Sequence, residues 1–190
     1  KKIGLLPFSI FTGMIGGFMI ASSAYREVHL LSIGYPLVLI GLVMGLSRLV
    51  WFLIGHHIRL LEKIPLSKIL LAELFIFPAS FILISQIHDP ILSGILFIVP
   101  LGYLWGRGPL IEEYFIRQYI KKPKYKATLL SIDSQIALVF QTLVAFGVGY
   151  VMHDSISEGY FVLGVVLFAL LAATYPFLSK QLSRDSKASV

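Results

Sequence analysis

The stretch GYLWGRGPLIEEYFIRQYIKKPKYKATLLSIDSQIALVFQ, residues 102–141, decides the fold of this chain. An apolar segment runs into charge, a dense basic cluster follows, and a second apolar segment begins. Lysine-rich loops stay on the cytoplasmic side of a membrane, so the cluster predicts which side this loop faces. Arg107 and Asp133 lie on the apolar side of the two borders of the cluster. Ionisable residues in such positions are candidates for function.

The composition points to a membrane protein. Hydrophobic residues make up 57% and charged residues 14% of the chain, whereas soluble domains carry roughly a quarter charged residues. The mean hydropathy is +0.85. The net charge of +6 is concentrated in alternate loops, which indicates orientation in a membrane and leaves no soluble basic face for nucleic acid. The chain has no cysteine, which excludes disulfides, thiolate metal sites and a cysteine nucleophile.

The apolar runs predict six spanning helices, because about 20 apolar residues cross a bilayer. The predicted fold class is therefore all-α, a polytopic membrane bundle without a soluble domain. A weak two-fold organisation, three helices and then three, is an alternative to chance similarity between apolar segments. The predicted helices cover residues 3–25, 33–55, 67–86, 90–111, 128–152 and 159–178, with a cytoplasmic tail over residues 179–190.

Small residues four apart mark places where two membrane helices can approach closely. The first predicted helix carries Gly13 and Gly17, and the second carries Gly41 and Gly45. A flexible glycine-rich helix is the alternative interpretation of the first pair.

The basic residues alternate from loop to loop. Most of the 16 Lys and Arg residues lie at the N-terminus, in the loops near residues 56–68 and 112–127, and after residue 178. The other loops hold Arg26 together with histidines and acids. Because positive loops stay inside, we expect a multi-pass protein of the plasma (inner) membrane with both termini in the cytoplasm.

Four charged residues fall within the predicted spans. Counting along each helix places them roughly 8–12 Å from the cytoplasmic edge, so their formal charges cancel in one layer. An unpaired charge there would cost several kcal/mol, so we expect pairing. The functional hypothesis is a cytoplasmic gate or a proton site, with Arg107 and Asp133 as the favoured pair; the alternative is that the charges lock helix ends or reach the interface. The four residues are Arg48, Glu73, Arg107 and Asp133.

Polar residues recur along the fifth predicted helix, which makes it a candidate lining of a pathway. Gln135 and Gln141 are the candidate lining residues beyond Asp133. No set of catalytic residues can be assembled, and the five His fall in predicted loops or at helix ends. We therefore expect no enzyme activity, no metal site and no cofactor.

Several short motifs carry a family resemblance. Arg107-Gly-Pro109, then Tyr114 and Arg117, then Lys126-Ala-Thr-Leu-Leu-Ser131 resemble the tenth and eleventh helices of bacterial major facilitator superfamily transporters. Lys126 stands where that family commonly has Arg. Arg48 and the loop over residues 55–63 resemble the eighth helix and its following loop, although the Asp and the second Gly of the usual signature are missing. The resemblance is specific over residues 102–178 and general over residues 3–86.

The resemblance implies the C-terminal six-helix half of a twelve-helix carrier that works by alternating access. We expect an efflux-type secondary carrier of a small organic molecule, with proton coupling as an option. The absence of an initial Met favours a fragment, and the expected partners are the lipid bilayer, a small-molecule substrate and an N-terminal six-helix half. The alternative is a complete six-helix channel or scaffold that works as a homodimer.

Overall fold

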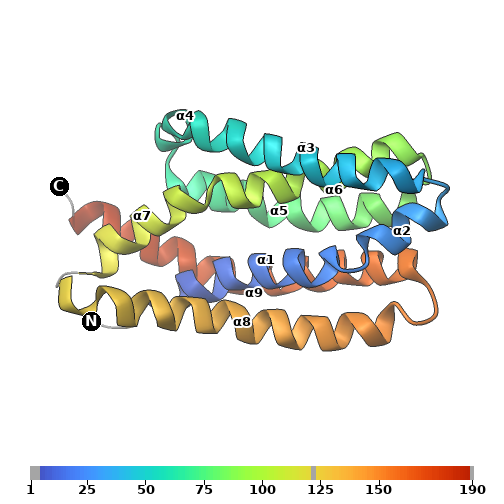
Figure 1. Cartoon of the computed structure of the whole chain (residues 1–190). Helices are drawn as coiled ribbons and strands as arrows, with labels where there is room; N and C mark the ends of the chain where they lie inside the picture. The colour runs from blue at the N-terminus through green and yellow to red at the C-terminus, as the bar shows by residue number, and fades with distance from the viewer. Residues whose placement is uncertain (1–4, 121–122, 189–190) are drawn as a thin grey trace.

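The computed structural model describes residues 5–120 and 123–188, and every regular element within that part of the chain is helical. Six stretches are long and apolar enough to cross a membrane. This confirms the predicted all-α bundle, and the chain has the architecture of a multi-pass membrane protein (Figure 1). The elements are α1 (Leu5–Ser23), α2 (Arg26–Ser32), α3 (Leu37–His56), α4 (Ile58–Glu62), α5 (Leu66–Gln86), α6 (Pro90–Gly106), α7 (Gly108–Tyr119), the 3-10 turn η1 (Pro123–Tyr125), α8 (Lys126–Val151) and α9 (Ile156–Ala188).

The long helices run side by side, so the bundle has two distinct ends. One end, which we call the basic end, holds α4, α7 and both ends of the chain (Figure 1). Arg59 on α4, Arg117 on α7 and Lys126 at the start of α8 lie there. The opposite end holds α2 and the turn between α8 and α9 (Figure 1).

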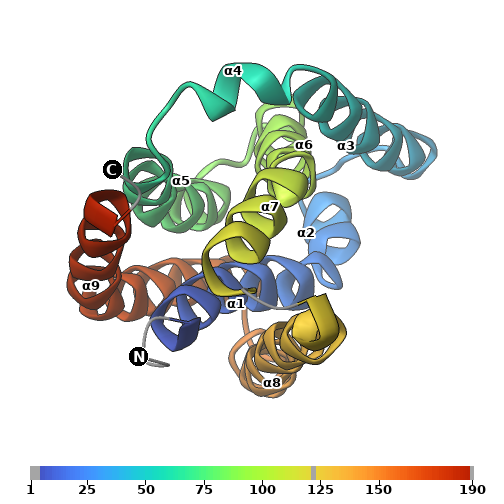
Figure 2. The same cartoon turned by 90° about the vertical axis from the view of Figure 1, so that its left-hand side faces the viewer.

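The six spanning helices pack in three principal pairs. α1 packs on α8, α3 packs on α6, and α5 packs on α9 (Figure 2). Secondary contacts join α1 to α9 and α5 to α6. These five contacts are related by an exchange of the first three spanning helices with the last three, in which α1 takes the place of α6, α3 of α8 and α5 of α9. The exchange converts α1–α8 into α6–α3 and α1–α9 into α6–α5, and it leaves α5–α9 unchanged. These contacts match the pattern that an inverted repeat of three helices would give, while the weaker α8–α9 contact has no counterpart of comparable extent between α3 and α5 among the described residues.

Glycines sit at two of these crossings. A methyl group on Gly17 would lie 2.8 Å from the backbone nitrogen of Gln141 on α8. On α6, a methyl group on Gly102 would lie 2.6 Å from the carbonyl oxygen of Ser47 on α3, and Gly106 is equally tight against Ile54. Each crossing thus depends on a glycine pair spaced by four residues, because only a hydrogen lets the backbones come so close.

The glycine pair of α1 therefore has the role predicted for it, whereas the pair of α3 makes no such close approach to the described residues of this chain. Gly41 and Gly45 face open space, with no atom within 4 Å of an added methyl group. The glycines that bring α3 and α6 together are on α6, so α3 keeps its own small-residue face uncovered.

Four segments differ from the predicted helix limits. α3 begins at Leu37 because Gly34 adopts a φ of 84°, in the left-handed region, and Pro36 precedes the first turn. The predicted outer loop folds into α2. The fourth spanning helix breaks at Arg107, where Pro109 removes a donor from the first turn of α7. α9 extends through the expected tail to Ala188.

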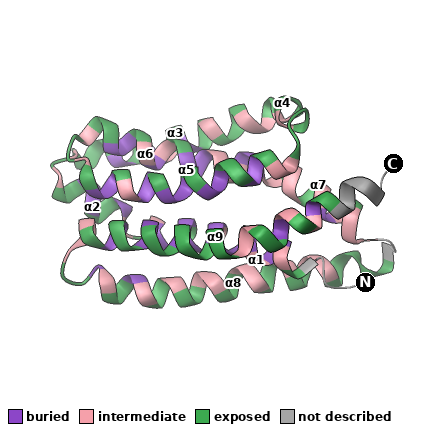
Figure 3. Ribbon diagram, turned by 180° about the vertical axis from the view of Figure 1, so that it is seen from behind, coloured by how far each residue is buried: buried purple, intermediate pink, exposed green. Residues whose placement is uncertain are grey.

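Burial is uneven among the helices. Buried residues concentrate on α1, α5 and α6, whereas α8 and α3 are mainly exposed (Figure 3). Their exposed side chains are largely Leu, Val and Phe. Such faces require lipid or another apolar surface to cover them.

Candidate functional site

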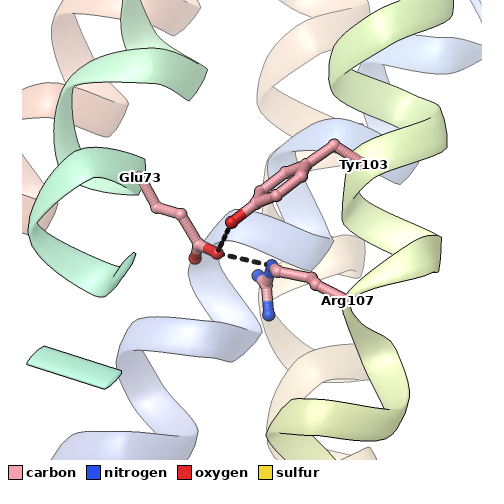
Figure 4. A network of polar contacts seen from close by, with 3 residues as sticks. All are labelled: Glu73, Tyr103 and Arg107. Carbon is pink, nitrogen blue, oxygen red and sulfur yellow. Dashed lines mark hydrogen bonds and ion pairs between the residues drawn. The ribbon is translucent and has the colours of Figure 1, made fainter. Parts of the chain in front are cut away.

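A buried ion pair joins α5 to α6. The Nε atom of Arg107 lies 2.7 Å from the Oε1 atom of Glu73, and their side chains are 4% and 0% exposed (Figure 4). The Tyr103 hydroxyl donates a hydrogen bond to the same Oε1 atom, at 3.0 Å (Figure 4). Glu73 therefore receives both a charge partner and a hydrogen bond inside the bundle.

Helix geometry explains why these groups meet. Tyr103 and Arg107 are four residues apart, so they share one face of the helix that leads into the break at Arg107. Glu73 and Phe77 share a face of α5 for the same reason, and the guanidinium carbon of Arg107 lies 6.0 Å from the centre of the Phe77 ring.

The pair is tightly held but incompletely satisfied. The Nε–H of Arg107 is not aligned with Oε1 as a hydrogen bond, so the contact is electrostatic. The second carboxylate oxygen of Glu73 is buried and has no hydrogen-bond partner within residues 5–120 and 123–188. Buried polar groups without partners are costly, so this oxygen reduces the net stabilisation that the pair gives to the bundle.

A cavity of about 460 Å³ opens beside the ion pair. It lies between α1, the α6–α7 break and α8, and both Arg107 and Asp133 line it. The Ser9 hydroxyl of α1 lies beside the Asp133 carboxylate. Arg107 and Asp133, which the sequence analysis favoured as a pair, thus line one cavity. Arg107 nevertheless forms its ion pair with Glu73. The remaining lining residues are Thr12, Gly13, Leu104, Gly108, Ile111, Glu112, Phe115, Leu130, Ser134 and Ala137.

Arg48 stands apart from this site. Its side chain is exposed on α3, and it forms no ion pair within the described part of the chain. Its neighbours Ser47 and Val50 pack against Gly102, so Arg48 is level with the ion pair along the bundle but points to another side. The predicted layer therefore contains Glu73, Arg107 and Asp133 in one region, with Arg48 separate.

The two glutamines of α8 occupy different surfaces. Gln141 is half-buried and its backbone contacts Gly17 of α1. Gln135 is exposed, and neither glutamine lines the cavity. Ser134, which the sequence did not single out as a site residue, does line the cavity next to Asp133.

The opposite end of the bundle contains a second buried polar group, which the sequence places in a loop. Arg26 and His29 of α2 are 5% and 1% exposed. The His29 ring packs edge-on against Tyr160 and Phe97, and the Tyr160 hydroxyl donates to the Ser22 carbonyl at 3.0 Å. Neither ring nitrogen of His29 has a hydrogen-bond partner among the described residues. Burial, followed by the nearby charge of His88, lowers the pKa of His29.

Burial also lowers the pKa of the Arg26 guanidinium. An Arg side chain remains charged across the physiological pH range, so the first residue of α2 carries a buried positive charge. Tyr103, Arg26 and His29 were missed by sequence reasoning. Tyr103 could have been found from its four-residue spacing to Arg107, whereas nothing in the sequence signals the burial of α2.

Among the described residues, no group of three or more His, Asp or Glu could hold a metal ion. Comparisons of the chain with family models, curated proteins and solved structures gave no match.

Proposed function

We propose that this chain is one six-helix half of a secondary carrier of the major facilitator type, which exports a small organic molecule by alternating access. Its partner is a second six-helix bundle. The coupling ion is a proton.

The inverted-repeat packing is the observation that carries this proposal. The α1–α8 crossing and the α6–α3 crossing each use a glycine pair, and the exchange of the two triplets relates one crossing to the other. Carriers commonly contain such three-helix inverted repeats, and they place substrate near the midplane at the interface between repeats or halves.

The distribution of exposed surface supports a second bundle as the partner. α3 and α8 flank one side of the molecule, with α1 and α6 between them (Figure 2). The cavity is lined from α1, α6, α7 and α8, so it belongs to this side. A second bundle placed here would cover the exposed faces of α3 and α8 and close the cavity.

The ion pair and Asp133 have separate roles in this proposal. The contact between Glu73 and Arg107 links α5 to α6 next to the cavity, and its rupture would release the basic end to move. Asp133 is a carboxylate exposed to the cavity, where it can take up and release a proton.

Cysteine accessibility tests alternating access without knowledge of the substrate. This chain has no cysteine, so a thiol introduced into it is the only thiol in this half of the proposed carrier. In a carrier, Ser134→Cys in the cavity reacts with a membrane-impermeant thiol reagent added to either side of oriented vesicles. The matched control is Gln135→Cys, which faces away from the cavity and reacts slowly from both sides. Reaction of Ser134→Cys from the basic end alone would contradict the proposal.

A homodimeric channel is the second candidate, because Gly41 and Gly45 leave a small-residue face of α3 open for another helix. Solute flux distinguishes the two. A carrier shows saturable flux and counterflow of a labelled solute, while a channel shows conductance that rises linearly with concentration.

A further inference from the structure

The cavity beside the ion pair has an excess of negative charge. Its charged lining residues among those described are Arg107, Glu112 and Asp133. Glu73, directly behind Arg107, neutralises the guanidinium through the 2.7 Å contact. The carboxylates of Glu112 and Asp133 remain, so the described lining presents two negative charges that no other charged lining residue balances.

The two carboxylates lie at different depths. Glu112 is exposed and lies at the start of α7, toward the basic end. Asp133 is partly buried, and its Oδ1 atom is enclosed without an aligned hydrogen-bond partner in the described part of the chain. A carboxylate oxygen of this kind favours a ligand that supplies positive charge.

Most of the remaining lining is apolar, with Thr12 and Ser134 as uncharged polar exceptions, and the cavity has a size suited to an organic molecule. The volume of about 460 Å³ lies within the range of roughly 300–1,000 Å³ that small-molecule pockets occupy. Leu104, Ile111, Phe115 and Leu130 supply hydrophobic surface. A hydrated inorganic cation would gain nothing from such walls, whereas an apolar body with a cationic head would be buried by them.

We propose that this cavity binds a lipophilic organic cation, with the apolar body against Leu104, Ile111 and Leu130 and the positive head at Asp133. This names the substrate class and rests on the transport function proposed above. An organic anion is disfavoured, because Glu73 already occupies Arg107 and the anion would meet both Glu112 and Asp133. Cation and proton compete for one carboxylate, so loading of one releases the other.

Two probes of one shape and opposite charge test the proposal. Tetraphenylphosphonium carries a permanent positive charge and no acidic proton, and tetraphenylborate is its anionic counterpart. Binding of each to the 190-residue chain in lipid nanodiscs is measured by equilibrium dialysis, with empty nanodiscs subtracted. We expect saturable binding of the phosphonium and none of the borate.

Substitutions test whether the phosphonium binds at the Asp133 carboxylate. Asp133→Asn keeps the shape of the side chain and should weaken phosphonium binding at least tenfold, while Glu112→Gln at the rim should weaken it only a few-fold. Asp154→Asn in the exposed turn at the opposite end is the matched control and should change nothing. Thermal unfolding of each variant verifies that the bundle is intact.

The outcomes separate this inference from the transport proposal. Equal binding of both probes, or phosphonium binding that Asp133→Asn leaves unchanged in a folded bundle, would overturn the cation site. If the carrier tests succeed with neutral or anionic solutes only, transport stands and the cation site fails. If phosphonium binds through Asp133 but Ser134→Cys is reached from one side only, the site stands and alternating access fails.

Discussion

Arg107, at the break between α6 and α7, and Glu73 on α5 hold each other by a 2.7 Å contact at a level where neither side chain has more than 4% of its surface exposed. The two helices are sequence neighbours, yet their packing is slight beside that of α5 on α9. The ion pair therefore joins two of the principal helix pairs, α3–α6 and α5–α9, at one point.

Removal of one partner should destabilise the bundle strongly. In Arg107→Met the carboxylate of Glu73 stays buried without its cation, and the loss of a partner from a buried pair costs about 3–5 kcal/mol. Replacement of both residues, Glu73→Leu with Arg107→Met, should recover most of this loss. Unfolding of the chain in mixed detergent micelles measures both. The control is Glu113→Gln, which removes an exposed ion pair with Arg117 and should cost less than about 1 kcal/mol.

Tyr103→Phe should destabilise the same pair by a smaller amount. The substitution removes the hydroxyl that donates to Glu73 at 3.0 Å, and hydrogen bonds to charged groups contribute about 1.5–3 kcal/mol. In a double-mutant cycle with Glu73→Leu, which leaves no acceptor for the hydroxyl, the two losses should not add, because both remove the same contact. Additive losses would show that Tyr103 acts elsewhere.

Neighbouring glycines of α1 should respond in opposite ways to a methyl group. Gly17→Ala forces α1 away from α8, since the new carbon would lie 2.8 Å from Gln141 N and 3.0 Å from the Phe140 carbonyl carbon. Overpacking of this kind costs about 1–3 kcal/mol. Gly16→Ala meets no atom within 4 Å and should be neutral or slightly stabilising. Unfolding midpoints of the two variants, measured side by side, check the prediction.

The inverted-repeat packing makes a parallel prediction for α6. Gly102→Ala, which would approach Ser47 O and Val50, should destabilise the bundle, whereas Gly45→Ala on α3 should not. If Gly45→Ala impairs transport while the unfolding midpoint is unchanged, the open face of α3 is the docking surface of the second bundle.

Acidification should loosen the opposite end. Burial lowers the pKa of His29 below its ordinary 6.5, so the native state holds the neutral ring while a state with α2 released can take up a proton. Stability is complete above pH 6.5 and falls as the pH drops below it, by up to about 1.4 kcal/mol per pH unit. Hydrogen exchange of α2 amides between pH 7.5 and 5.5 measures this. His29→Gln should abolish the pH dependence, and His153→Gln, which removes an exposed ring, should preserve it.

Prediction from sequence worked best for features that depend on one quantity, such as the length of an apolar segment or the position of a residue along its helix. Helices long and apolar enough to span a membrane follow from apolar length alone, and residue counting predicts that Glu73, Arg107 and Asp133 lie at a similar depth. The direction in which each side chain points around its helix axis cannot be obtained by counting residues, because it depends on how the helices are rotated against one another. The sequence therefore placed the charges at one level, but it could not decide whether Glu73 or Asp133 contacts Arg107.

Two features depend on tertiary packing that no local pattern records. α2 buries Arg26 and His29, residue types that are rarely buried without partners. Which glycine pair mediates a crossing depends on the surface opposite: Gly102 and Gly106 meet α3, while the identically spaced Gly41 and Gly45 meet nothing.

The order of helix pairing has a consequence for how the protein is made. α1, α3 and α5 pack principally on α8, α6 and α9, all of which lie in the second half of the chain. During synthesis the first three spanning helices therefore enter the bilayer before their main partners exist. α3 must wait there with Arg48 and an uncovered glycine face until α6 emerges. Pairing in the order of synthesis would form the α3–α6 contact first, then α1–α8, and α5–α9 last.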